Sequence, residues 1–276
     1  GLFKSTNGGG RWTSTLLPGY PQDTSADGMA SPLKGLHAGA DAVVRPGSHG
    51  LFYYGGLAFN RGENQPSRIF VARYQDRNNK ENGDPFVYQG ASIVAANKTG
   101  EFLDKPSFAV DVPRSGSGTC NIDGAPTPAG AVYAAWSVFL SRDHPHGRKD
   151  KDDDDEGDES EGSVSQIRSR IVFSRSSDCG RTWAAPKILS DSRTNQGSAI
   201  AIDPRNGHIY VAWRQFETWH WIHAIFVRKS TDGGRTFGPK IPIWGFFPFD
   251  QGTSNTSFRT NSYPTIAVDH TGRVYV

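Results

Sequence analysis

The chain alternates short apolar runs with turns rich in glycine, proline, aspartate and asparagine. Runs of this length, in which β-branched and aromatic residues are frequent, predict β-strands rather than helices. One run is nearly repeated, since 193–203 and 259–269 both begin Arg-Thr-Asn and end in an apolar stretch closed by aspartate. A looser copy occupies 104–111. A second type of run, which contains tyrosine and usually tryptophan, occurs at 131–136, 207–213 and 273–276.

A third type of apolar run precedes a repeated turn of the form Ser-x-Asp/Asn-x-Gly, which an aromatic residue closes. The turn occurs at 5–12, 176–183 and 230–237. In such a turn the Asp or Asn side chain accepts hydrogen bonds from backbone amides, and glycine adopts the positive φ that other residues avoid. Three copies, each at the end of a strand-like run, predict a repeat architecture.

Together these runs define a repeated unit of four antiparallel strands, in which the turn joins the third strand to the fourth. Such repetition predicts an all-β fold, a β-propeller formed by 1–276 as a single domain. We expect half-blades at 1–18 and 262–276 and complete blades at 38–98, 103–190 and 195–245. Two arrangements stay open. Either the chain is part of a larger propeller, whose missing blades or a partner chain cover the open sheet edges, or the half-blades pair and close a four-bladed ring.

The repeated turn resembles the Asp-box, or bacterial neuraminidase repeat, of sialidases and other β-propellers. The resemblance covers the blade-like segments of nearly the whole chain and implies a sialidase-like propeller of six blades. It also implies that the turns lie away from the active site, so the motif alone says little about chemistry.

Composition adds limits on partners. The 276 residues include 30 Lys and Arg against 28 Asp and Glu, but nine of the acidic residues fall within 150–161. We expect the insertion that contains them, 143–166, to be disordered. No apolar run approaches the roughly 20 residues that span a membrane, and no nucleic-acid-binding motif is present, so we expect neither a membrane span nor a nucleic-acid partner. We also expect no metal site and no cofactor.

The two cysteines, Cys120 and Cys179, are predicted to form a disulfide. Cys120 falls in the long connection between the first and second strands of its blade, and Cys179 falls in the repeated turn of the same blade. Both connections lie on one face of the blade because its strands alternate in direction. A disulfide indicates an oxidising compartment, so we expect a secreted, extracellular or cell-surface protein.

The opposite face is where a ligand site is expected, because the loops that enter each first strand and leave each second strand meet there. Arginines, carboxylates and aromatic side chains on this face suit a carbohydrate or an acidic sugar. The candidates are Arg61, Asp104, Arg193, Arg214, Glu217, Trp219, Trp221, Arg259 and Tyr263. A structural role is the alternative for several of them. Arg193 and Arg259 occupy one repeat position and equally fit a link between blades, and the tryptophans equally fit packing between blades.

The sialidases that the chain resembles clamp the substrate carboxylate with three arginines, and they use a tyrosine nucleophile paired with a glutamate and an aspartate as acid and base. The resemblance implies that Arg193 and Arg259 are clamps, that Tyr263 pairs with Glu217, and that Asp104 is the acid and base. The Phe/Tyr-Arg-Ile-Pro motif that carries the first arginine is absent, because 67–70 reads Ser-Arg-Ile-Phe. Three functions therefore stay open: glycan recognition, exo-glycosidase activity of the sialidase type, and a purely structural or protein-binding role.

Overall fold

A computed structural model describes residues 1–62, 64–76, 86–122, 124–140, 168–191, 193–219, 222–247 and 262–276. The regular secondary structure of the described chain is nearly all β, as the sequence predicts. Its helix, α1 (Ala26–Ala30), is one short turn-and-a-half within the loop expected at 19–37. The expected insertion 143–166 lies outside the described residues. In the part of the chain that is described, no helix has the length and apolar character needed to cross a membrane.

Three four-stranded sheets form the body of the molecule, and within each sheet neighbouring strands are antiparallel. The first sheet contains β3 (Ala38–Pro46), β4 (Leu51–Phe59), β5 (Ser67–Asp76) and β6 (Phe86–Ala96). The second contains β7 (Glu101–Val110), β10 (Val132–Leu140), β11 (Arg168–Ser176) and β12 (Lys187–Ile188). The third contains β13 (Asn195–Ile202), β14 (Ile209–Trp219), β15 (Ile222–Ser230) and β16 (Ile241–Phe246). Strands follow one another across each sheet in chain order, which confirms the expected antiparallel four-stranded pattern.

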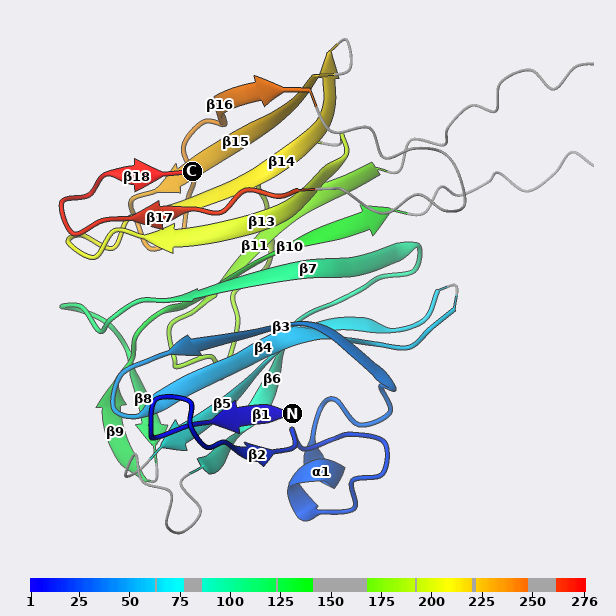
Figure 1. The fold of residues 1–276 in the computed structure, drawn as a ribbon, viewed down its shortest axis with the longest axis vertical. Coiled ribbons are helices and arrows are strands. Elements are labelled where there is room, and N and C mark those ends of the chain that lie inside the picture. Colours follow the sequence, from blue (N-terminus) through cyan, green and yellow to red (C-terminus); the bar gives the residue numbers. More distant parts are fainter. Residues whose placement is uncertain are drawn as a thin grey trace, which may run out of the picture.

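The sheets lie one above another, and the first strand of each contacts the first strand of the next (Figure 1). The strand β3 contacts β7, β7 contacts β13, and β13 contacts β17 (Ala267–Val268). We call these four the innermost strands. Two-stranded sheets stand at both ends of the stack: β1 (Leu2–Lys4) pairs with β2 (Thr13–Thr15), and β17 pairs with β18 (Val274–Tyr275). These two small sheets are separate and do not pair with each other.

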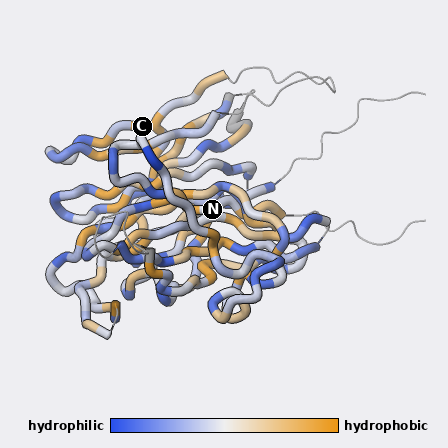
Figure 2. Tube along the Cα trace, turned by 60° about the horizontal axis from the view of Figure 1, so that its bottom comes forward, coloured by the Kyte–Doolittle hydropathy of each residue, from blue (hydrophilic) through white to orange (hydrophobic). Residues whose placement is uncertain are grey.

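Hydrophobic cores fill the spaces between neighbouring sheets, so burial links each sheet to the next. Between the first and second sheets, Leu57 and Val71 pack with Leu103 and Trp136. A second core, between the second and third sheets, includes Phe173, Val211 and Trp213, which are less than 1% exposed. Figure 2 shows the same division along the chain, with hydrophobic residues in the strands and hydrophilic residues at many of the connecting turns.

The three repeated turns share one hydrogen-bonded geometry. In the turn at 176–183, the Ser176 hydroxyl donates to Asp178 at 2.7 Å and accepts from the Gly180 amide at 2.9 Å, while Asp178 accepts from the Thr182 amide at 2.9 Å. The turn at 230–237 repeats these bonds at 2.8, 2.9 and 2.9 Å. The turn at 5–12 repeats them with asparagine in place of aspartate, at 3.0, 2.8 and 2.8 Å. Sequence similarity among the three turns therefore reflects the same local structure.

Each of the two later turns also reaches back to the preceding sheet. The indole N–H of Trp183 donates to Ser92 Oγ of β6 at 3.0 Å. The ring of Phe237 packs edge-on against Phe173 of β11, with 4.9 Å between the centroids. Trp12, which closes the first turn, is instead 60% exposed. The turns at 176–183 and 230–237 thus contact the preceding sheet as well as joining two strands of their own sheet.

The predicted disulfide between Cys120 and Cys179 is confirmed, with 5.8 Å between the two Cα atoms. Cys120 lies in β8 (Thr119–Ile122), which forms a hairpin with β9 (Ala125–Pro128) inside the long connection between β7 and β10. Cys179 lies in the repeated turn, and both cysteines are buried in the core between the first two sheets. The connection and the turn therefore meet on one face of the second sheet, as the alternation of strand direction predicts.

Candidate functional site

The innermost strands β3, β7 and β13 carry the same irregularity at the same place. Each has a shift in its pairing register with the neighbouring strand, at Ala40/Val43, opposite Ala135/Ser137, and at Gln196/Ala199. Each shift contains a residue with positive φ, at 54° for Asp41, 51° for Lys105 and 66° for Gly197. A bulge of this kind redirects side chains away from the regular alternation of a strand.

The bulges of these strands face one pocket of about 400 Å³, which we call the hub pocket. Equivalent pairs of residues from the four innermost segments line it: Asp41 and Ala42, Lys105 and Pro106, Gly197 and Ser198, and Tyr263 and Pro264, together with Val43. Aligning the aspartates that close each first strand places Lys105, Gly197 and Tyr263 at one repeat position. The hub pocket is therefore where the repeat converges, with a different side chain from each unit.

The polar wall of the hub pocket is formed by the carboxyl group of Asp41 and the ammonium group of Lys105, which Asp104 contacts from outside the lining. The backbone N–H of Lys105 donates to Asp41 Oδ2 at 3.1 Å and to Asp104 Oδ1 at 2.9 Å, so one amide holds both carboxyl groups. The ammonium group of Lys105 pairs with Asp104 Oδ2 at 2.8 Å. Asp104 lies directly behind Lys105, and Asp41 is at the exposed rim.

Because both carboxyl groups accept from the Lys105 amide, Asp41 and Asp104 lie close together. Burial raises the pKa of Asp41, and the neighbouring charge of Asp104 raises it further. Burial alone would lower the pKa of Lys105, but the hydrogen bond and charge of Asp104, together with the nearby Tyr263 and Asp41, outweigh it and the pKa is raised. At neutral pH the wall therefore carries an ammonium group balanced by Asp104, beside a carboxyl group that is more readily protonated than usual.

Tyr263 supplies the aromatic wall. The Lys105 ammonium lies 5.7 Å from the centroid of the Tyr263 ring. The Tyr263 hydroxyl donates to Gln196 Oε1 at 3.0 Å. A Cβ at Gly197 would lie 2.1 Å from Cδ1 of this ring, so only glycine permits the approach. Because an amide oxygen takes no proton from a phenol, Gln196 orients Tyr263 without activating it as a nucleophile.

Arg214 is enclosed by protein and is only 2% exposed. Its guanidinium lies 4.2 Å from the ring centroid of Phe216 and 5.1 Å from that of Phe246. It donates to the Ser262 carbonyl at 2.9 Å and to His223 Nδ1 at 3.1 Å. Burial lowers the pKa of His223 to about 4, and the charge of Arg214 adds to this effect, so the ring offers a neutral nitrogen as acceptor. In this arrangement Arg214 braces the segment that begins at Ser262, next to the hub pocket.

The other sequence candidates are less closely gathered. Asp104 and Tyr263 are brought together around Lys105, as their positions at the start of first strands predict. Arg61 and Arg193 are exposed in connections between strands and do not line the hub pocket. Glu217 and Trp219 lie in β14, but their side chains are outside the described part of the structure, and Trp221 and Arg259 lie outside the described residues altogether.

Asp41 and Lys105 line the hub pocket, and both stand at the entrance of a first strand, although Asp104 was the residue chosen there as the acid. The signal that identifies Lys105 is its repeat position, shared with Gly197 and Tyr263. Asp41 has no such signal, because the run at 38–46 lacks the closing Asp by which the other first strands are aligned.

Comparisons with known proteins give similarities to solved structures and no match at the level of sequence. No protein-family model matches the sequence, and no curated protein matches it. Among solved structures, the chain is similar to a protein titled "Hadza microbial sialidase Hz136", with a TM-score of 0.46 and 15% sequence identity. The match covers 75% of this chain and 38% of that protein, so the chain spans well under half of its length.

Proposed function

We propose that the protein binds carbohydrate in the hub pocket. The observation that carries the proposal is the convergence of Asp41, Lys105 and Tyr263, from three different units, on one pocket of about 400 Å³. A carboxylate accepts hydrogen bonds from sugar hydroxyls, and an ammonium group donates hydrogen bonds to them. A tyrosine ring provides a flat face for the apolar side of a pyranose. A pocket of this volume with a few convergent polar groups has the usual properties of a small-molecule site.

The charges favour an uncharged sugar over an acidic one. Within the described lining of the pocket the cation is Lys105, and Asp104 already pairs with it. Asp41 adds a further carboxyl group at the rim, which would repel a sugar carboxylate whenever it is ionised. Recognition of an acidic sugar would depend on a further cation such as Arg259, which lies outside the described residues.

A glycan array followed by calorimetric titration tests this proposal. We expect Tyr263→Ala to weaken binding of the selected glycan at least about tenfold, because the stacking face is lost. Tyr275→Ala is the matched control, since Tyr275 is an exposed tyrosine of the same terminal segment whose hydroxyl donates to Asp269 at 3.1 Å. Equal affinity of the Tyr263→Ala variant and the unaltered protein would refute binding in the hub pocket.

Glycoside hydrolysis is the second candidate, and the neighbouring carboxyl groups of Asp41 and Asp104, which both accept from the Lys105 amide, favour it together with the raised pKa of Asp41. A carboxyl group that keeps its proton at higher pH than usual can protonate a leaving group, and a second carboxylate nearby can stabilise positive charge on the sugar. The test is release of 4-nitrophenol or a fluorogenic aglycone from a panel of glycosides that includes a sialoside. Activity should fall as the pH rises through the raised pKa of Asp41, and Asp41→Asn should abolish it. Absence of turnover across the panel would exclude this function.

We also propose that the chain forms part of an Asp-box β-propeller of sialidase-like type whose further blades cover the two-stranded sheets. The support is the shared geometry of the repeated turns and the exposure of Phe3, Trp12 and Tyr275, at 63%, 60% and 54%. The propeller would comprise the half-blades 1–18 and 262–276 and the blades 38–98, 103–190 and 195–245. The disulfide supports a secreted or cell-surface location. Expression of the complete gene product, with its retention in or release from the cell measured, tests the location.

A further inference from the structure

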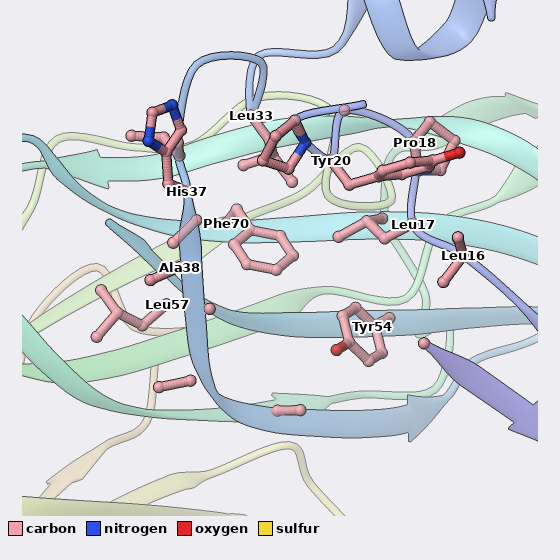
Figure 3. Close-up of a pocket in the computed structure, with 18 of the residues that line it drawn as sticks. Leu16, Leu17, Pro18, Tyr20, Leu33, His37, Ala38, Tyr54, Leu57 and Phe70 are labelled. Atoms are coloured by element: carbon pink, nitrogen blue, oxygen red, sulfur yellow. The ribbon is translucent and has the colours of Figure 1, made fainter. Parts of the chain in front are cut away.

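A second pocket, of about 360 Å³, lies beside the hub pocket and is mostly apolar. We call it the side pocket. One wall is the face of the first sheet, with Tyr54, Leu57 and Phe70, and the other is the segment 16–37, with Leu17 and Leu33. Figure 3 shows Leu17, Leu33, Tyr54 and Phe70 around the same space. Its titratable groups are Asp41, His37, Tyr20, Tyr54 and the amino group of Gly1. The other lining residues are leucine, proline, alanine, glycine and phenylalanine, so the side pocket is suited to an apolar group.

The segment 16–37 is the longest of the links that join a fourth strand to the next first strand. It joins a fourth strand, β2, to the next first strand, β3, through 22 residues. The equivalent links are four residues long between β6 and β7 (97–100), six between β12 and β13 (189–194) and twenty between β16 and β17 (247–266). Long ordered connections in compact domains are commonly functional.

Hydrogen bonds hold this segment in one shape against the first sheet. Asp23 is 5% exposed and accepts from the Gly19 amide at 2.9 Å, which closes the loop on itself. The Arg68 guanidinium donates to the Pro32 carbonyl at 2.6 Å, and the Asn60 amide donates to the Gly35 carbonyl at 3.2 Å. Hydrogen bonds therefore fix the wall that the segment 16–37 contributes to the side pocket.

The side pocket and the hub pocket share two lining residues, Asp41 and Ala42. These residues form the bulge of β3, so the two pockets lie on either side of one strand irregularity. A substituent that extends from the hub pocket past Asp41 would enter the apolar side pocket, because Asp41 lines both pockets. The two pockets together offer a polar compartment joined to an apolar one.

We propose that the side pocket holds an apolar aglycone, an alkyl or aryl group, attached to the sugar that occupies the hub pocket. This inference rests on the proposed carbohydrate function and deepens it by naming the ligand class, an amphipathic glycoside. The sugar contacts Asp41, Lys105 and Tyr263, and the aglycone lies between the first sheet and segment 16–37. Free sugars without an apolar substituent occupy only the hub pocket and bind more weakly.

The variant that tests the proposal is Gly39→Trp, which fills the side pocket from β3. A Cβ at Gly39 would meet only the Leu57 carbonyl oxygen, at 3.6 Å, so the substitution fits the backbone. Gly238→Trp is the matched control, because a Cβ there would meet only the Lys229 carbonyl oxygen, also at 3.6 Å, and Gly238 lies just beyond the repeated turn 230–237. Leu16→Glu, at a 59% exposed position of the side-pocket lining, is a second variant that keeps the test valid if Gly39→Trp does not fold.

The measurement is calorimetric titration with methyl and octyl glycosides of glucose, galactose, mannose and N-acetylglucosamine, and with 1-naphthol as an apolar probe. For a sugar that binds, we expect the octyl glycoside to bind at least about tenfold more tightly than the methyl glycoside, because each buried methylene adds to affinity. In Gly39→Trp and Leu16→Glu this ratio should fall toward one while methyl-glycoside affinity is kept, and Gly238→Trp should behave like the unaltered protein.

Two results would overturn the assignment. The first is equal binding of methyl and octyl glycosides by the unaltered protein, or a preference that Gly39→Trp leaves intact. The second is binding of 1-naphthol, lost in Gly39→Trp, without binding of any glycoside. In that case the proposed carbohydrate function fails and the side pocket is an apolar site unconnected with an aglycone.

Discussion

Removal of the Cys120–Cys179 disulfide should destabilise the protein by about 4 kcal/mol. The bridge closes a loop with a sequence separation of 59 residues. In the chain-entropy model a loop of this size restricts the unfolded chain by about 14 cal/mol/K, which is about 4 kcal/mol at 25 °C. The native contacts of Cys120 and Cys179 in the core between the first two sheets add to this figure when the sulfurs are removed.

The choice of replacement at position 179 sharpens the experiment. Cys179 has a φ of 58°, a conformation that favours glycine over alanine. The double variant Cys120→Ala/Cys179→Gly therefore removes the cross-link and relieves the backbone, whereas Cys120→Ala/Cys179→Ala removes the cross-link and keeps the strain. We expect the glycine version to be the more stable of the two by about 1–2 kcal/mol.

The assay is urea unfolding, followed by tryptophan fluorescence, of the unaltered protein with and without a reductant and of both double variants. Addition of reductant should lower the stability of the unaltered protein toward that of the variants and leave the variants unchanged. If the alanine double variant unfolds at the same urea concentration as the oxidised protein, the loop-closure argument is wrong.

Three further predictions concern single side chains. Gly197→Ala should destabilise by about 1–2 kcal/mol from its positive φ alone and should also displace the Tyr263 ring, and thermal unfolding together with the Tyr263 environment by NMR checks both effects. Asn195→Leu should cost about 3 kcal/mol in urea unfolding, because it leaves the buried indole N–H of Trp213, which donates to Asn195 Oδ1 at 2.9 Å, without an acceptor; no change would contradict this. Burial would raise the pKa of Asp232, but the hydrogen bonds of the turn 230–237 outweigh it and lower the pKa to about 2. The stability that these hydrogen bonds contribute is therefore present above about pH 4 and lost as the pH falls through about 2. The difference in Tm between the unaltered protein and Asp232→Asn should shrink over that range, and a constant difference would refute the assignment.

Local patterns were sufficient to predict the antiparallel sheets, because each strand type carries its own residue signature and the repeated turn has one set of hydrogen bonds. The disulfide followed from strand direction alone. The five-residue helix α1 was not predicted, and the hydrogen bonds that hold 16–37 against the first sheet could not be, since they come from Arg68 of β5 and from Asn60, which follows β4.

The polar wall of the hub pocket shows a different limit. Asp104 and Tyr263 were found because the start of a first strand is a position that sequence can identify. The bulges at Asp41 and Lys105 place non-glycine residues at positive φ, which neither residue type indicates. Arg214 was expected to face a ligand, but it is enclosed by Phe216 of its own strand, His223 of β15 and Phe246 of β16, and which side chains meet across neighbouring strands depends on a register that the sequence pattern does not give.

The most direct test of a carbohydrate site in the hub pocket is a crystal structure of the protein with the glycan that binds most tightly on an array. The account predicts a sugar ring stacked on Tyr263, with hydroxyl groups within hydrogen-bond distance of Asp41 and Lys105. A glycan bound elsewhere, with the hub pocket holding only water, would contradict it.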